Sequence, residues 1–163
     1  MSMVSCGSAT PKATPITFSS VIDFSNWEGT FAGQYAQSTP MCLLEPVDTA
    51  DDSLEAMVNS QVRGEIQAKQ QPNMLLLACF LGLRSQGGEA IVIRTITLEA
   101  TTLFVYADIS VPAPDTFTEG GTHSPVSIVQ VQQAAMTQNT PLTLQLIDSA
   151  TDQVLAINKT ILP

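Results

Sequence analysis

The feature that most constrains the fold is an almost continuous series of β-type segments after Pro72. Runs rich in β-branched, aromatic and other apolar residues alternate there with short stretches that contain Gly, Pro, Asn or Asp. We expect strands at 74–81, 90–98, 103–111 and 125–131, followed by a C-terminal hairpin of 142–146 and 154–162 around a turn at 148–152. This series predicts a mainly β protein, built as an antiparallel β-sandwich or a barrel-like sheet.

Two of these segments have side-chain patterns that predict their burial. Residues 74–83 (MLLLACFLGL) are apolar almost throughout, but they are about half of the roughly 20 residues that span a bilayer. We therefore expect a strand that is buried on both faces. In the segment 103–111, small and aliphatic residues at odd positions alternate with Phe104, Tyr106, Asp108 and Ser110, which predicts a strand with two different faces.

The first half of the chain predicts fewer elements. Residues 1–12 have the low complexity of a flexible leader, and 13–163 are expected to form a single β-rich domain. Strands are expected at 14–22 and 41–44, and one α-helix at 51–62, which makes the fold α+β. Apolar residues recur at helical spacing there, and Gly64 stands where a C′ residue would end the helix. The aromatic residues of the segment 23–40 either fold onto the core or form a binding platform; they are Phe24, Trp27, Phe31 and Tyr35.

The charge distribution argues against nucleic acid as a partner. The chain has 15 acidic and 6 basic residues and a formal net charge of −9, and the basic residues are scattered along the sequence. No basic patch is therefore expected to neutralise phosphates or to bind an anionic membrane surface. The acidity is explained by solubility.

Catalytic and metal-binding patterns are missing from the sequence. His123 is the only histidine, no nucleophile elbow is present, and no His, Cys or acidic set has metal-ligand spacing. Asp51 and Glu55 share a helix face, but helix capping explains them better than a metal. The glycine-rich segment 82–88 leads into a strand rather than a helix, unlike a phosphate-binding loop. We expect no enzyme, cofactor or metal site, and a hydrolase centred on His123 is the weakest alternative.

The three cysteines differ in context. Cys42 and Cys79 lie in apolar runs, so we expect free buried thiols, with a disulfide as the alternative if their strands are neighbours. Cys6 lies in Met3-Val-Ser-Cys-Gly-Ser8, which resembles the cleavage box of bacterial lipoproteins, although no apolar h-region precedes it in this sequence. Cys6 is therefore either a lipidation site, which would be the only link to a membrane, or a residue of the tail.

The order of segments between Met74 and Val131 resembles the C-terminal domain family of the protease-complex subunit PrcB. That family has an apolar strand, a glycine-rich loop, a β-branched strand, a strand that ends in proline and a proline-led apolar strand. The corresponding segments are Met74–Leu81, Gly82-Leu-Arg-Ser-Gln-Gly-Gly-Glu89, Ile91–Leu98, Leu103–Pro114 and Ser124-Pro-Val-Ser-Ile-Val129. The chain departs from the family pattern at Gln86, where Thr or Ser is usual, and at Glu89, which replaces a tyrosine.

The resemblance implies a non-catalytic accessory protein outside the cytoplasm, which assists the assembly or stability of a secreted protease. Contact with the protein partner is expected in the segments 82–89 and 115–124. The candidate residues are Arg84, Ser85, Gly87, Gly88, Glu89 and His123. A purely structural role is the alternative for Gly87-Gly88, as a tight turn that sets strand register. The alternative function is a proteinase inhibitor that inserts the glycine loop into an active-site cleft.

Overall fold

The computed structural model describes residues 12–22, 39–47, 54, 57–58, 60–86, 88–116 and 120–163, with only the backbone path at 85–86 and 120–123. The strands in chain order are β1 (Thr14–Pro15), β2 (Phe18–Ile22), β3 (Met41–Pro46), β4 (Met74–Phe80), β5 (Arg84–Gln86), β6 (Ala90–Glu99), β7 (Thr102–Ser110), β8 (Gly120–His123), β9 (Val126–Gln132), β10 (Pro141–Asp148) and β11 (Val154–Ile161). The helical elements are α2 (Ser60–Lys69) and the 3-10 turn η2 (Gln133–Ala135).

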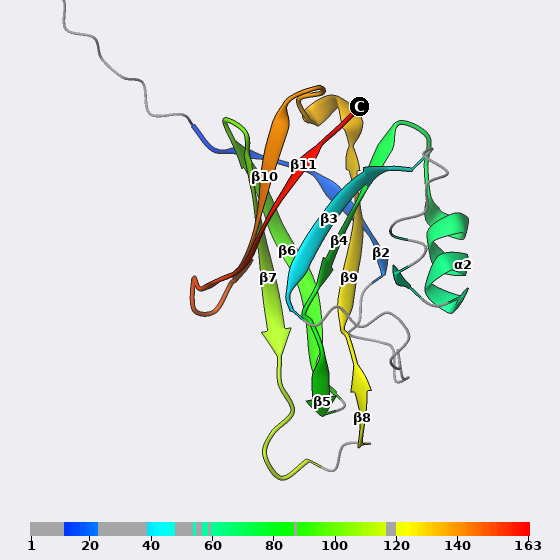
Figure 1. Cartoon of the computed structure of the whole chain (residues 1–163), viewed down its shortest axis with the longest axis vertical. Coiled ribbons are helices and arrows are strands. Elements are labelled where there is room, and N and C mark those ends of the chain that lie inside the picture. The colour runs from blue at the N-terminus through cyan, green and yellow to red at the C-terminus, as the bar shows by residue number, and fades with distance from the viewer. Residues whose placement is uncertain are drawn as a thin grey trace, which may run out of the picture.

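These strands form a sandwich of two sheets, with α2 as a third layer (Figure 1). Sheet A has the order β1-β6-β7-β10-β11, and sheet B has the order β2-β9-β4-β3. The prediction of a mainly β, antiparallel sandwich with one helix is confirmed, and the barrel-like alternative is not, because each sheet ends in two edge strands. One pair of strands is not antiparallel. β7 and β10 are parallel, because the chain passes through sheet B between them.

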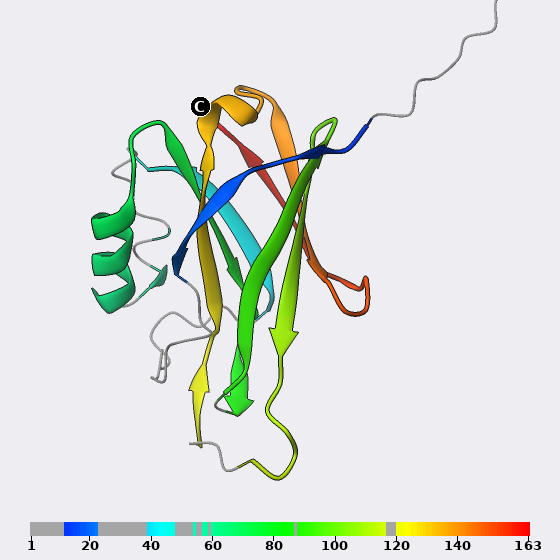
Figure 2. The same cartoon turned by 180° about the vertical axis from the view of Figure 1, so that it is seen from behind.

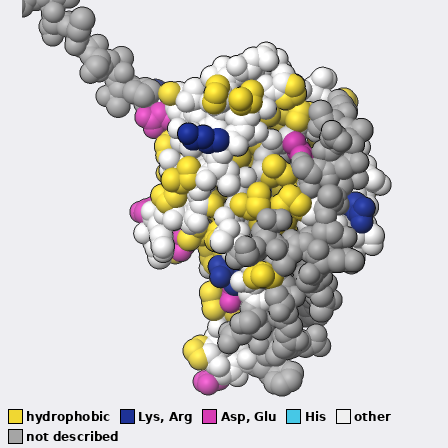
Figure 3. Space-filling model, in the orientation of Figure 1, with side chains coloured by type: hydrophobic (Ala, Val, Ile, Leu, Met, Phe, Trp, Pro, Cys, Tyr) yellow, Lys and Arg dark blue, Asp and Glu magenta, His cyan; other side chains and the backbone are white. Residues whose placement is uncertain are grey.

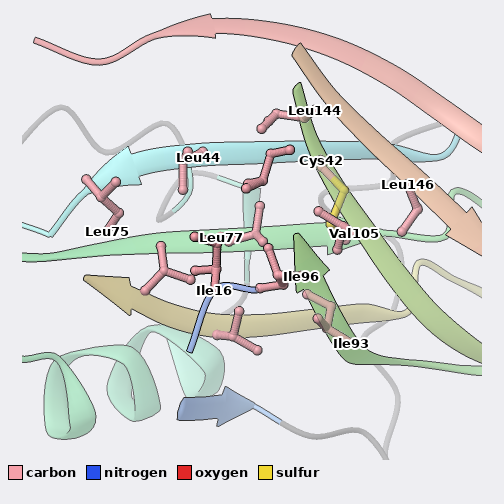
Figure 4. Close-up of a cluster of buried hydrophobic side chains, with 14 of the residues drawn as sticks. Ile16, Cys42, Leu44, Leu75, Leu77, Ile93, Ile96, Val105, Leu144 and Leu146 are labelled. Carbon is pink, nitrogen blue, oxygen red and sulfur yellow. A yellow bond between two sulfur atoms is a disulfide. The ribbon is translucent and has the colours of Figure 1, made fainter. Parts of the chain in front are cut away.

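The main core lies between the sheets and follows the alternation of the strands. In β7 the side chains of Leu103, Val105 and Ala107 are buried, as predicted, and they face apolar residues of sheet B such as Leu75 and Leu77 (Figure 4). Alternation ends earlier than expected, because β7 stops at Ser110. A second core lies on the other side of sheet B.

Strand β4 contributes to both cores, which explains its unbroken apolar sequence. Leu75, Leu77 and Cys79 belong to the core between the sheets. Leu76, Ala78 and Phe80 point to the opposite face of sheet B, where they join the second core together with residues of α2. The prediction of a strand buried on both faces is therefore confirmed.

The helix prediction is correct in kind and wrong in extent. Helix α2 runs from Ser60 to Lys69, so Gly64 lies inside it rather than at its end. A glycine costs a helix only about 1 kcal/mol relative to alanine, and burial of Ile66 beyond it favours continuation. Leu54 and Met57 are also helical, whereas the expected N-terminal residues 51–53 lie outside the described residues.

Buried Gln130 of β9 attaches the end of α2 to sheet B. Its Oε1 accepts a 2.9 Å hydrogen bond from the amide of Gln71, and its Nε2 donates a 2.8 Å hydrogen bond to the carbonyl of Lys69. The Lys69 ammonium in turn donates to the carbonyl of Val21 in β2. The bond to the Lys69 carbonyl satisfies one of the carbonyl groups that the C-terminus of a helix leaves unpaired.

Cys42 and Cys79 form a disulfide, which overturns the expectation of free thiols. The two residues lie directly opposite each other in β3 and β4, with their Cα atoms 4.1 Å apart. The sequence places both residues in apolar strands but does not reveal that these strands are neighbours, and that pairing brings the sulfur atoms together.

Candidate protein-binding end

The two segments predicted to contact a partner come together in one two-stranded ribbon. We expected loops at 82–89 and 115–124, but the first contains β5 and the second contains β8, and these strands pair antiparallel. Arg84 lies opposite His123, and Gln86 lies opposite Gly120. Strand structure was missed there because pairing partners about 40 residues apart are not visible from local propensity, and glycines lower that propensity.

The ribbon extends the antiparallel pair of β4 and β9 beyond the sandwich. The amide of Leu81 donates a 2.9 Å hydrogen bond to the carbonyl of Pro125, which joins the two parts. Both views show β5 and β8 at the end of the molecule opposite β1 and the C-terminus (Figures 1 and 2). The residues expected to bind a partner and the start of the described chain thus lie at opposite ends of the molecule.

Gly82 permits the bend between β4 and β5. Its φ is +84°, and a Cβ placed there would lie 2.9 Å from the carbonyl carbon of Thr39. A side chain is therefore excluded both by backbone conformation and by space. Gly88, in the turn after β5, also has a φ of +84°, which supports the predicted turn role for this glycine.

An ion pair spans this turn. The Arg84 Nε lies 2.8 Å from Oε2 of Glu89, and both side chains are partly buried. The Nε is buried and its N–H does not make an aligned hydrogen bond, so the contact is electrostatic. These two candidate residues satisfy each other's charge, and a partner would contact them as a neutral pair.

Apolar residues that the sequence did not single out are exposed at the same end. Leu83 is 37% exposed, and Val111 is 65% exposed just beyond β7. The sequence predicts a strand that includes Val111, but β7 ends one residue earlier. The proline-containing segment 112–114 was a signal for that ending, because proline cannot donate to a ladder.

The other candidates are placed only in part. The backbone of Ser85 lies in β5 and that of His123 in β8, while Gly87, Cys6 and the aromatic segment 23–38 lie outside the described residues. Ser124, next to His123, has a buried Oγ without a hydrogen-bond partner among the described residues. Within these residues, no three His, Cys, Asp or Glu side chains gather into a possible metal site. No described helix is long and apolar enough to span a membrane.

Comparison of the chain with protein-family models, with curated proteins and with solved structures gave no match.

Proposed function

We propose that this protein is a non-catalytic binding or accessory protein that works outside the cytoplasm and engages a protein partner through its ribbon end. The ribbon end consists of β5, β8, Gly88, Glu89 and residues 111–116. The observation that carries the proposal is the pairing of β5 with β8, because it joins two separately predicted contact segments into one surface. Exposed Leu83 and Val111 beside them add apolar area of the kind that protein interfaces bury.

An oxidising compartment is supported by the Cys42–Cys79 disulfide. Structural disulfides persist in secreted and periplasmic proteins and are rare in a reducing cytoplasm. If Cys6 carries a lipid, the leader would anchor the molecule at the end where β1 lies. The attachment point would then lie at the end opposite the ribbon end, which leaves the ribbon end accessible to a second protein.

A secreted protease is the partner class that the PrcB resemblance suggests. The resembling segment 74–131 covers β4 to β9, which includes the whole ribbon and strands of both sheets. A catalytic role has less support, because His123 is the only histidine of the chain and most acid–base sites need further partners.

The alternative function, a proteinase inhibitor, is favoured by one observation. The turn after β5 is held by the Arg84–Glu89 ion pair and by the positive φ of Gly88. A preorganised loop loses little entropy when it enters a cleft, which is how rigid inhibitor loops gain affinity. Incubation with a panel of secreted serine and cysteine proteases distinguishes the two functions, because an inhibitor reduces the rate of peptide hydrolysis and an accessory protein does not.

The ribbon end is tested by quantitative pull-down from an envelope fraction with Leu83→Ser/Val111→Ser and with the matched control Ile161→Ser, which is exposed to a similar extent on β11. We expect the first variant to lose a partner that wild type and the control retain. Equal recovery by all three proteins would contradict the proposal. Intact mass of the envelope protein shows at the same time whether Cys6 is lipidated and Cys42 oxidised.

A further inference from the structure

The outer face of sheet A is not covered by any described element. Helix α2 and the second core cover the outer face of sheet B, whereas no described helix or strand lies against the outer face of sheet A, on the side away from α2 (Figure 1). Over β10 and β11, hydrophobic and uncharged atoms dominate the visible surface (Figure 3). An exposed face of an antiparallel sheet is ordinarily polar.

Strand register defines which side chains share this face. Outward residues form three rows across β6, β7, β10 and β11, and each row takes one residue from each strand. The rows are Glu99-Thr102-Thr143-Lys159, Thr97-Phe104-Gln145-Ile157 and Thr95-Tyr106-Ile147-Val154. The pair Pro141-Ile161 lies beyond the first row, and the pair Val92-Asp108 lies beyond the third, where Asp108 forms an ion pair with Arg94.

Apolar side chains form one patch within these rows. We call it the outer patch; its members are Phe104, Tyr106, Ile147, Val154 and Ile157. Val154 and Ile157 are large apolar residues that are 44% and 60% exposed. Ile147 points outward and is nevertheless only 6% exposed, without belonging to either core. The patch is therefore a separate cluster, buried at its centre and open at its edge.

The charges on the three rows are self-complementary. Glu99 and Lys159 are the only charged residues in them, and they stand at opposite ends of the same row. A two-fold axis that lies in the interface and runs along the strands, between β7 and β10, reverses the order of strands in a facing copy. Each Glu99 then faces the Lys159 of the other copy, twice in one dimer.

We propose that the outer face of sheet A mediates a weak, symmetric dimer of this chain. Four strands about 4.8 Å apart and eight residues of about 3.4 Å each give roughly 500 Å² of sheet per protomer. Both copies together bury roughly 1,000 Å², which is at the lower limit for specific interfaces. An interface of this small size is expected to give a weak dimer, in which the two sheets pack face to face. It leaves the ribbon end free, so it is independent of the proposed partner contact.

Sedimentation equilibrium of the full chain, from about 1 µM to about 1 mM at about 0.15 M salt, tests the proposal. We expect a monomer–dimer equilibrium that Ile157→Ser weakens at least about tenfold, because the contact is lost twice per dimer. Val111→Ser, equally exposed but off this face, leaves the dissociation constant unchanged. A monomer at all concentrations, or a dimer insensitive to Ile157→Ser, overturns the proposal.

Charge exchange identifies the symmetry. Glu99→Lys and Lys159→Glu each place like charges opposite each other, so each single variant weakens the dimer. The double variant restores the opposite-charge pairs and with them the dissociation constant of wild type. A double variant that is weaker than both single variants would exclude the facing of Glu99 and Lys159. Unchanged thermal unfolding of the variants shows that the fold is intact.

Discussion

The backbone amide of Cys42 donates a 2.8 Å hydrogen bond to Oδ1 of Asn158, and this contact links the two sheets along one side of the sandwich. Cys42 lies opposite Cys79 in a close antiparallel pair, and in such a pair the amides point away from the partner strand. The amide of edge strand β3 thus points toward β11, the edge strand of sheet A. On the other side of the sandwich, Ser127 Oγ accepts from the amide of Ile93 in β6. The Asn158 side chain thus satisfies an amide of an edge strand that could otherwise pair with another strand.

Loss of the Asn158 acceptor should destabilise the protein. We expect Asn158→Ala to lower the free energy of unfolding by about 1–3 kcal/mol, because the partly buried amide of Cys42 loses its partner. Asn158→Asp keeps an acceptor at the same place and should cost less. Urea unfolding followed by circular dichroism measures both losses of stability. Equal losses would argue against the hydrogen bond as the cause.

The disulfide should be a major contributor to stability. It closes a segment with a sequence separation of 37 residues, for which the chain-entropy relation gives about 3–4 kcal/mol. We expect Cys42→Ala/Cys79→Ala to lose about that much free energy of unfolding. Because both cysteines are buried, a thiol reductant should react slowly with the native protein and rapidly in denaturant. Alkylation of the released thiols with iodoacetamide, followed by mass spectrometry, measures the rate of reduction. Equal rates for the native and the denatured protein would contradict this prediction.

Two glycines should respond to alanine in opposite directions. Gly64 lies inside α2, and a Cβ there meets nothing within 4 Å, so Gly64→Ala should raise the free energy of unfolding by about 0.5–1 kcal/mol. Gly82→Ala should lower it, because the φ of +84° and the backbone of Thr39 both exclude a side chain. Melting temperatures of the two variants test the pair, and a destabilised Gly64→Ala would contradict the helical role of this position.

Gln130 should be intolerant of replacement despite its place among apolar residues. Gln130→Leu keeps the approximate volume but leaves the amide of Gln71 and the carbonyl of Lys69 unpaired, at a cost of about 1–3 kcal/mol for each buried group that water cannot reach. Hydrogen exchange should show faster exchange at the C-terminal end of α2, with β6 and β7 unaffected. Uniform protection of α2 in this variant would show that the glutamine does not hold the helix end.

Side-chain periodicity predicted the elements that bury one face or both faces. The alternation of Leu103, Val105 and Ala107 and the unbroken run of β4 reappear as buried faces. The C-terminal boundary of the helix was predicted wrongly from Gly64, because the sequence does not show that Ile66 is buried in the second core. The candidate site was predicted as two loops, since the residues that pair β5 with β8 are far apart in the chain.

Local sequence, then, determined most of the strands, their buried faces and the presence of a helix, because backbone propensity and side-chain alternation act between near neighbours. The tertiary structure decided everything that depends on which strands are adjacent: the Cys42–Cys79 disulfide, the parallel pair of β7 and β10, the β5–β8 ribbon and the outer patch. Strand pairing depends on contacts between residues distant in sequence, whose free energy no single segment contains.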